Sequence, residues 1–343
     1  MHSYASFRVE AVKPAEFEVL LTPLSKLYYG GERAVFSLGA RYMFGGALDG
    51  APVDLSFNLT PSAYTPKGWE KYSFYQSNSE NGKDLLSSRI TLDEKGSKTF
   101  DFTMPSVSYS ALLYVQAGVL SPQNQKLFAR SAVSVLPADV FIGVKSEERM
   151  AEAGKPFTFD IVAVDAEGKL LPAAQLQGKI FRKEYMSVRK TGVAGRLEWI
   201  SEEKTEDISS FSLNASEGKA QYSFTPEKAG SYNLTLTSKD AKGRLNYTDY
   251  SFYVTDGEAY WKQTDDDLLS LQLNKDEYKI GSKASLLIKS PYKKAQALIT
   301  VEREGVLDYY VKTVKGGAAK VSIPGKENYA PNAFISVILG QTP

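Results

Sequence analysis

The side chains that most often carry enzyme chemistry are almost absent from this sequence. Its 343 residues include no cysteine and one histidine, His2. Without cysteine, the chain offers no thiol nucleophile, disulfide, iron–sulfur ligand or thiolate ligand for zinc. With one histidine, it cannot build a Ser-His-Asp hydrolase alone, so Ser209 and Ser210 have no visible base. We therefore expect no catalytic residue, metal site or cofactor, and predict that the chain is not an enzyme.

Two clusters of acidic residues could still bind a cation or act as paired carboxylates. Asp265, Asp266 and Asp267 are oxygen ligands of the kind that Ca²⁺ prefers. Adjacent residues of a strand point to opposite faces, so we favour an acidic linker for this run. Residues 202–203 are Glu-Glu and residues 206–207 are Glu-Asp. Glycosidase carboxylates must face each other across a cleft at a defined separation, so we favour a solvated loop for this second cluster.

Aromatic side chains gather in the polar stretch 65–83 and could form a binding surface. Trp69, Tyr72 and Tyr75 are the candidate interaction residues, with Phe74 between them. Exposed aromatic rings contribute strongly to interfaces, so these residues could bind sugars or a partner protein. The alternative, which we favour, is a hairpin whose alternate aromatic residues cover the body of the domain.

The charge balance and hydropathy restrict the partners of the chain. It has 41 basic and 40 acidic side chains and a formal net charge of +1. Such a chain has no long-range field that attracts nucleic acid or an anionic membrane. No run of about 18 apolar residues is present, so we expect no membrane contact by this segment.

Apolar and polar residues alternate with a period of two in most of the chain. Residues 17–21, 99–102, 157–161 and 232–236 are examples, and each run is bounded by turn-forming residues. No amphipathic pattern longer than about three helical turns has start and stop signals. The sequence therefore predicts an all-β fold of tandem antiparallel β-sandwich domains.

A repeated glycine pattern marks the units of this fold. Gly31, Gly154 and Gly281 are each followed by apolar residues three, five and seven positions later, and each is preceded by a strand pattern. We interpret the pattern as a strand, a turn whose glycine adopts positive φ, and a second strand. The spacing of roughly 125 residues matches one β-sandwich domain.

This repeat predicts how the chain is divided into domains. We expect residues 1–14 to be the last strand of a preceding domain and a linker. We then expect β-sandwich domains at 15–136 and 137–256, each ending in a closing strand. Residues 257–343 would be a third such domain, incomplete at its C-terminus because no comparable closing strand follows.

Several motifs, taken in order, resemble macroglobulin domains of the alpha-macroglobulin family. They are Tyr-Gly-Gly-Glu at 29–32, Ser-Val-Arg-Lys at 187–190, Phe-Thr-Pro-Glu at 224–227, the run at 297–305 and Tyr-Ala-Pro-Asn at 329–332. The last two are similar to the bacterial branch in particular. The resemblance implies that the sandwiches are of the macroglobulin or fibronectin-III-like type, with macroglobulin-like domains at 15–136, 137–256 and 257–343. Such a run comes from the N-terminal half of a family member.

The resemblance also implies a function. The segment would be the non-catalytic scaffold of a broad-range protease inhibitor that traps proteases after they cleave its bait region. Its partners would be neighbouring domains of the same chain and, through the full-length protein, proteases. The location would be the periplasm, the cell envelope or the extracellular space, and the full-length protein could be a lipoprotein, as bacterial members commonly are. Family members often carry a thioester between Cys and Gln, but no thioester residue lies in this cysteine-free segment. The alternative function is a cell-surface adhesin or glycan-binding array of Ig-like domains.

A bait region should be an exposed, protease-sensitive stretch. Lys67–Lys83 and Met186–Asp207 contain basic and aromatic cleavage points and are the best candidates in the sequence. Both are short, and the second overlaps a family-like motif. We favour ordinary sandwich loops for both and expect the bait segment downstream of Pro343.

Overall fold

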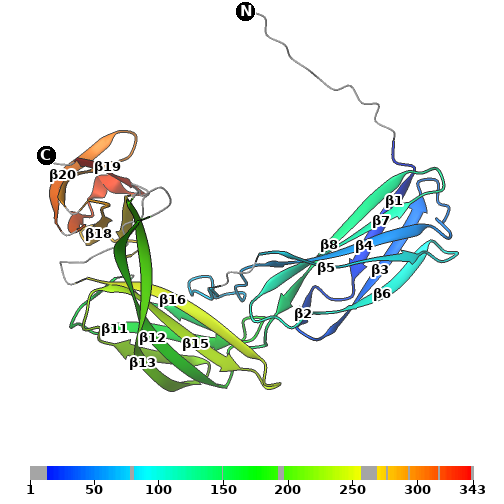
Figure 1. Ribbon diagram of the computed structural model, residues 1–343, viewed down its shortest axis with the longest axis horizontal. Helices are drawn as coiled ribbons and strands as arrows, with labels where there is room; N and C mark the ends of the chain where they lie inside the picture. Colours follow the sequence, from blue (N-terminus) through cyan, green and yellow to red (C-terminus); the bar gives the residue numbers. More distant parts are fainter. Residues whose placement is uncertain are drawn as a thin grey trace, which may run out of the picture. The chain divides into compact units, whose positions relative to one another are not determined.

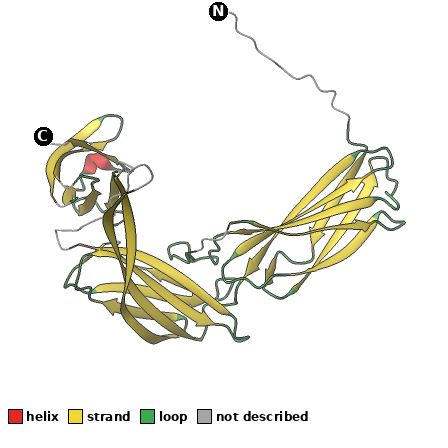
Figure 2. Cartoon of the chain, in the orientation of Figure 1, coloured by secondary structure: helices red, strands yellow, loops and turns green. Residues whose placement is uncertain are grey.

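The fold is built almost entirely of β-strands, as the period-two pattern predicts (Figures 1 and 2). The computed structural model describes residues 14–77, 81–148, 150–191, 197–255, 269–275, 277–292, 294–315 and 317–340, without the side chains of residues 184–203. In this described part, the single helical element is a 3₁₀ turn, η2 (Glu327–Tyr329). None of the helical structure seen there is long and apolar enough to span a bilayer.

Strands β1 to β8 form two sheets. They are β1 (Phe17–Pro23), β2 (Leu27–Tyr29), β3 (Arg33–Tyr42), β4 (Pro52–Pro61), β5 (Lys83–Thr91), β6 (Ser97–Thr103), β7 (Ala111–Leu120) and β8 (Lys126–Leu136). One sheet has the order β1-β3-β6 and the other β2-β8-β7-β4-β5. Inward side chains of both sheets form one core that includes the fully buried Phe17, Phe36 and Leu113. This arrangement is a β-sandwich.

Strands β9 to β16 form one continuous eight-stranded sheet. They are β9 (Phe141–Lys145), β10 (Met150–Glu152), β11 (Phe157–Val164), β12 (Ala173–Thr191), β13 (Leu197–Ser216), β14 (Lys219–Phe224), β15 (Gly230–Lys239) and β16 (Leu245–Thr255). The order is β10-β16-β15-β12-β13-β14-β11-β9. A core that includes Phe159, Leu176 and Leu234 lies among these strands. We call this sheet, together with its core, the second sandwich.

Strands β17 to β22 form a third core. They are β17 (Ser270–Leu273), β18 (Lys283–Lys289), β19 (Lys294–Glu302), β20 (Val306–Lys315), β21 (Ala318–Pro324) and β22 (Phe334–Gly340). The order is β17-β18-β21-β20-β19-β22. Ile288, Ala297 and Ile299 are fully buried at its centre.

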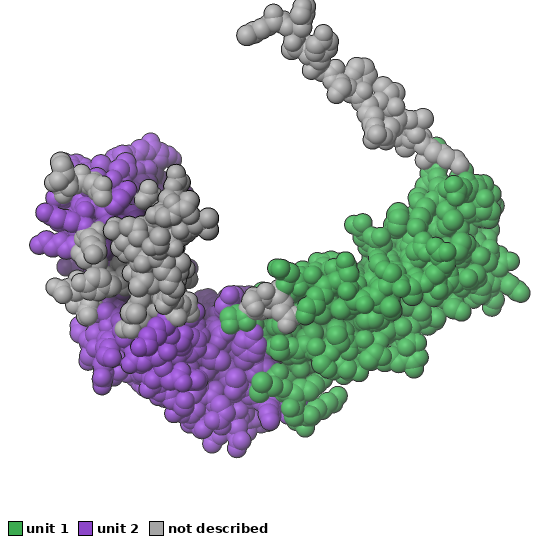
Figure 3. Space-filling model, in the orientation of Figure 1, with its two compact units in different colours: residues 1–64, 76–139, 241–245 green, residues 65–75, 140–240, 246–343 purple. Residues whose placement is uncertain are grey.

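The chain is divided into two compact units, and each unit includes one short segment that connects two strands of the other unit (Figure 3). Unit 1 comprises residues 1–64, 76–139 and 241–245, and unit 2 comprises the remainder. The connection from β4 to β5 thus contributes residues 65–75 to unit 2. The turn between β15 and β16 contributes residues 241–245 to unit 1.

The predicted glycine repeat is confirmed. Gly31, Gly154 and Gly281 have φ angles of +83°, +78° and +83°. In each turn, the residue after the glycine donates a backbone hydrogen bond of 3.0–3.1 Å to the carbonyl two residues before the glycine. The flanking strands pair antiparallel as β1–β3, β9–β11 and β17–β18. A positive φ at this turn position favours glycine, which explains the repeat.

Residues 186–207 differ from the solvated loop that the sequence suggested. They belong to β12 and β13, which pair antiparallel from Ala173–Ser216 out to Thr191–Leu197. Strand β15 pairs with β12 only over Gln177–Lys183, so the outer part of this hairpin has one neighbouring strand fewer. The charged composition of residues 186–207 concealed their strand character, because the sequence there lacks strict apolar alternation.

Candidate functional site

The aromatic stretch 65–75 packs within unit 2. The indole Nε1 of Trp69 donates a hydrogen bond of 2.8 Å to the Gly168 carbonyl. The rings of Trp69 and Tyr72 meet edge to face, with centroids 5.3 Å apart. Ser73 forms an isolated antiparallel bridge with Val144 of β9. These contacts hold the segment against the second sandwich.

The three candidate interaction residues differ in how much of each ring stays accessible. Trp69 and Tyr72 are half-buried, whereas the Tyr75 side chain is 58% exposed. Phe74, between them, is buried, and a Cβ added at Gly143 would lie 2.6 Å from its Cζ. Phe74 therefore anchors the segment, and Tyr75 presents the largest open ring. An interaction surface at Trp69, Tyr72 and Tyr75 stays a prediction.

The acidic residues described at the second cluster are ion-paired on strand β13. Asp207 lies 3.0 Å from the Lys179 ammonium, and Glu206 lies 2.9 Å from the Arg182 guanidinium. The side chains of Glu202 and Glu203, and the run 265–267, lie outside the described part of the molecule. Within that part, no group of three or more His, Cys, Asp or Glu side chains could hold a metal ion. The described carboxylates of this cluster thus serve as ion-pair partners.

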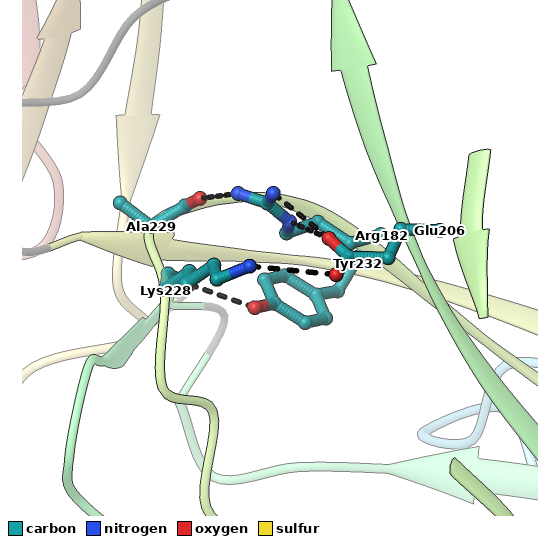
Figure 4. Close-up of polar contacts among 5 residues, drawn as sticks. All are labelled: Arg182, Glu206, Lys228, Ala229 and Tyr232. Carbon is teal, nitrogen blue, oxygen red and sulfur yellow. Dashed lines mark hydrogen bonds and ion pairs between the residues drawn. The ribbon is translucent and has the colours of Figure 1, made fainter. Parts of the chain in front are cut away.

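Arg182 is the centre of a polar cluster where the β12–β13 hairpin leaves the second sandwich (Figure 4). Its Nε and Nη2 both donate to Glu206 Oε2, at 3.1 and 2.9 Å, and its Nη1 donates to the Ala229 carbonyl at 3.0 Å. Lys228 adds a longer contact of 3.4 Å to the other oxygen of Glu206. These partners satisfy a guanidinium whose side chain is 8% exposed, and the hydrogen bond from Arg182 lowers the pKa of Glu206.

Tyr232 stabilises the same cluster through a hydrogen bond to the backbone of Lys228 (Figure 4). Its hydroxyl donates a hydrogen bond of 2.8 Å to the carbonyl of Lys228, four residues upstream. Burial raises the pKa of Tyr232, so the phenol stays protonated and remains a donor. A buried tyrosine bonded back to the preceding corner is a recurrent feature of Ig-like sandwiches. The cluster therefore has a structural role.

The sequence signal for Arg182 was present but went unused. Leu176 and Ile180 lie inward on β12, and a period of two places residue 182 on the same face. A charged residue at an inward position requires partners, which here come from β13 and from the 228–229 corner. Those partners are 24 and 47 residues distant, so a local pattern could not supply them.

Unit 1 contains a second polar cluster, around Tyr29. The Tyr29 hydroxyl donates a hydrogen bond of 2.6 Å to Asp139 Oδ1. Burial and this carboxylate raise the pKa of Tyr29. The Arg244 guanidinium lies 4.0 Å from the centre of the Tyr29 ring and 3.9 Å from Glu32 Oε1. Stacking on an aromatic ring and pairing with a carboxylate are both favourable for arginine, so this cluster ties residues 241–245 into unit 1.

The two candidate cleavage stretches lie in ordered surroundings where they are described. Residues 67–75 lie in the segment that packs within unit 2, and residues 81–82 precede β5, which begins at Lys83. The stretch Met186–Asp207 is paired backbone on both sides of residues 192–196, which lie outside the described part.

Family models match two adjacent parts of the chain. Residues 143–256 match bacterial macroglobulin domain 6, and residues 269–343 match the alpha-2-macroglobulin bait region domain. The second match covers residues for which we predicted a third macroglobulin-like domain. The position of the bait segment itself, expected beyond Pro343, stays a prediction.

Curated relatives share similarity along nearly the full chain. An alpha-2-macroglobulin homolog of Nostoc sp. is 26% identical over 342 residues, which is 97% of this chain and 18% of the relative. The alpha-2-macroglobulin of Rickettsia conorii is 23% identical over 307 residues, or 86% of this chain and 16% of the relative. The chain therefore spans less than a fifth of the length of these relatives.

Solved structures share the fold. The native conformation of E. coli alpha-2-macroglobulin aligns over 97% of this chain and 23% of its own length, with a TM-score of 0.51 and 17% identity. Salmonella alpha-2-macroglobulin reacted with methylamine aligns over 96% and 23%, with a TM-score of 0.53 and 16% identity. E. coli alpha-2-macroglobulin activated by porcine elastase aligns over 96% and 35%, with a TM-score of 0.52 and 14% identity. At these identities the similarity concerns the fold alone.

Proposed function

Because the chain belongs to the bacterial branch of the alpha-2-macroglobulin family, we propose that it is a non-catalytic scaffold segment of a broad-range protease inhibitor. The observation that carries this proposal is the order of the two matches, macroglobulin domain 6 at 143–256 followed directly by the bait region domain at 269–343. In the proposed mechanism, a protease cleaves the bait region, and the rest of the full-length protein then traps it.

The construction of the segment suits a scaffold. Each of the three sheet systems has its own core of apolar side chains, and no disulfide is needed to complete them. Backbone paired in sheets over a packed core is cleaved only after local unfolding. Such a body would stay intact while a protease selects an exposed segment elsewhere in the protein.

The partners and the location belong to this proposal as well. The relatives of similar fold include an E. coli protein activated by porcine elastase, which supports proteases as partners of the full-length protein. We place the protein in the periplasm or cell envelope, where an inhibitor would meet proteases that enter from outside. This segment contributes the frame, and no step of protease chemistry is assigned to its side chains.

The experiment uses the full-length protein that contains this segment. It is incubated with elastase, and the residual activity is measured on a small peptide substrate and on a large protein substrate. Trapping predicts that activity on the peptide persists while activity on the protein falls at least tenfold. Elastase blocked covalently at its active site is the control, since it cannot cut a bait and should not be retained. Equal activity on both substrates before and after incubation would refute the proposal.

A further inference from the structure

The pair Asn81-Gly82 is the one place in the sequence where glycine follows asparagine. Both residues are exposed, and they lie directly before β5, which begins at Lys83. Asparagine is one of the thermolabile residues of proteins. Its side-chain amide can be attacked by the backbone nitrogen of the next residue, and glycine, which has no Cβ, hinders that approach least. The pair is therefore where this reaction meets the least steric resistance.

An Asn-Gly pair often forms a tight hairpin turn, but this pair does not. A two-residue type I′ turn requires positive φ at both central residues. Gly82 does not have positive φ, and the connection from β4 to β5 covers residues 62–82. A close approach explains the glycine instead, because an added Cβ would lie 3.2 Å from Thr60 Oγ1. The pair is thus not locked in a turn.

Hydrogen bonds hold the side-chain amides of other asparagines. Asn58 Nδ2 donates to Asp84 Oδ1 at 2.9 Å. Asn246 is buried, and its Nδ2 donates to the Val140 carbonyl at 2.7 Å. In the part of the chain that the structure describes, the side-chain amide of Asn81 forms no hydrogen bond. Its carbonyl carbon is therefore free to turn toward the following backbone nitrogen.

Asn124 is the matched comparison, because it is exposed like Asn81. The next residue, Gln125, carries a side chain, and its backbone N–H donates to Ser121 Oγ at 3.2 Å. The nitrogen that would attack Asn124 is thus both hindered and engaged. Exposure alone does not distinguish the two sites, whereas the residue that follows does.

The pairing of β5 with β4 starts immediately after Gly82. Lys83 pairs with Leu59, and Asp84 pairs with Asn58 beside a β-bulge of β4. Strand β5 is an edge strand, so its backbone is paired on one side only. A change in the length of the main chain directly before β5 would therefore act on the end of a strand with one neighbour.

We propose that Asn81 is a site of spontaneous deamidation, with isoaspartate as the main product, and that this product loosens the beginning of β5. The backbone nitrogen of Gly82 forms a bond to Cγ of Asn81 and loses its proton. The bond from Cγ to the amide nitrogen breaks, and that nitrogen leaves as ammonia with the proton. A cyclic imide remains, whose nitrogen is bonded to Cγ and to the main-chain carbonyl carbon.

Water then opens the imide at one of these two C–N bonds. Cleavage at Cγ gives aspartate, and cleavage at the main-chain carbonyl gives isoaspartate, in which the chain continues through Cγ. Either product adds one carboxylate to 41 basic and 40 acidic side chains, so the formal net charge falls from +1 to 0. Isoaspartate also adds one carbon to the main chain. The inference is independent of protease inhibition.

The experiment measures the rate in the folded chain against the rate without the fold. The chain is incubated in mildly alkaline buffer and digested with trypsin. Peptide 72–83 should gain about 1 Da, and fragmentation should place the gain at Asn81 and not at Asn78. A synthetic peptide of residues 76–86 gives the unfolded rate, and the folded rate should lie within about threefold of it. A greater difference would overturn the proposal, because the fold would then protect the site.

Two controls test the selection of the site. Asn124 should react at least about tenfold more slowly than Asn81 in the folded chain, because its attacking nitrogen is hindered and engaged. Equal rates would overturn the proposal. Asn81→Gln should abolish the mass gain of peptide 72–83, because the longer side chain would have to close a six-membered ring. A gain that persisted in this variant would assign the reaction to another residue.

Hydrogen exchange tests the effect on β5. The isoaspartate form is separated by ion exchange and compared with Asn81→Asp, which carries the same charge on an ordinary main chain. The amides of residues 83–86 should exchange at least about threefold faster in the isoaspartate form. Equal exchange would refute the loosening of β5, and aspartate as the main product would refute the assignment of isoaspartate.

Discussion

The positive φ of the repeat turns gives a prediction whose size follows from geometry. Gly31 has a φ of +83°, and an added Cβ would meet nothing within 4 Å. Gly31→Ala therefore tests the backbone conformation alone. Alanine is less stable than glycine at positive φ, and the lower entropy of the unfolded alanine chain offsets part of this cost, so unit 1 should be destabilised by about 1 kcal/mol. Gly96 also has positive φ, but there a Cβ would overlap the Ala40 carbonyl oxygen and lie 2.8 Å from the Leu48 nitrogen. Gly96→Ala should cost more than about 3 kcal/mol.

Gly39 supplies the matched control within the same unit. It lies in β3 without positive φ, and an added Cβ again meets nothing within 4 Å. Gly39→Ala should leave stability unchanged or raise it by about 0.5 kcal/mol, since alanine has less freedom to lose on folding.

Hydrogen exchange of the β7 amides is the appropriate assay, because a bulk melting curve would mix the transitions of several sandwiches. Exchange through unfolding should be about fivefold faster in Gly31→Ala and more than about 100-fold faster in Gly96→Ala. In Gly39→Ala it should be unchanged or slower. If Gly31→Ala exchanged at the rate of the unsubstituted chain, or as fast as Gly96→Ala, the left-handed turn would not be the reason for the repeat.

Three further predictions concern single side chains. Tyr232→Phe removes one buried hydrogen bond and should destabilise the second sandwich by about 1–2 kcal/mol, seen as faster exchange of β15 amides; no change would mean that the corner carbonyl finds another donor. Hydrogen bonds from two lysines lower the pKa of Glu152 to about 2, so its contribution is complete above the unfolded value near 4.3 and is lost as pH falls toward 2. Exchange of the β16 amides should thus be faster in Glu152→Gln than in the unsubstituted chain at pH 6, and the ratio of the two rates, taken at equal pH, should approach one as pH falls through 2; a ratio independent of pH would contradict this. Phe74→Ala removes the buried anchor of residues 65–75, at a cost of about 3 kcal/mol, and should speed tryptic cleavage after Lys71 roughly 100-fold, whereas Tyr75→Ala, which changes an exposed ring, should not.

What the sequence could predict is the part of the fold set by local rules. The glycine turns, the strand pairs beside them and the inward apolar residues all follow from short-range patterns. The chain also predicts an all-β fold from its period-two alternation, and the sheets confirm it. Each of these features depends on residues a few positions apart, where backbone conformation and side-chain direction are coupled.

What the sequence could not predict depends on partners far along the chain. The sequence predicts that alternate aromatic residues of 65–83 cover a domain, but the burial of Phe74 against Gly143 requires residues 65–75 to join unit 2, and the sequence does not say which unit they join. Arg182 reads as a surface charge until Glu206 and the Ala229 carbonyl are placed beside it. The period of two places Arg182 inward, but neither the partners of Arg182 nor the unit that receives Phe74 has a local signature in the sequence.

The repeats also indicate where function is expected to lie on this fold. Their cores differ in sequence, since apolar burial has no direction and tolerates exchange of side chains of similar volume. The turn glycine and its hydrogen bonds persist, since they require one backbone conformation and fixed donors. Features that depart from the shared frame are therefore the ones under a separate constraint. They are the segment 65–75 and the extended β12–β13 hairpin. The first belongs to unit 2, although the strands before and after it belong to unit 1. The second continues as a two-stranded pair beyond the residues of β12 that β15 supports. These two segments are accordingly the places where the chain spends sequence on something other than the shared sandwich frame.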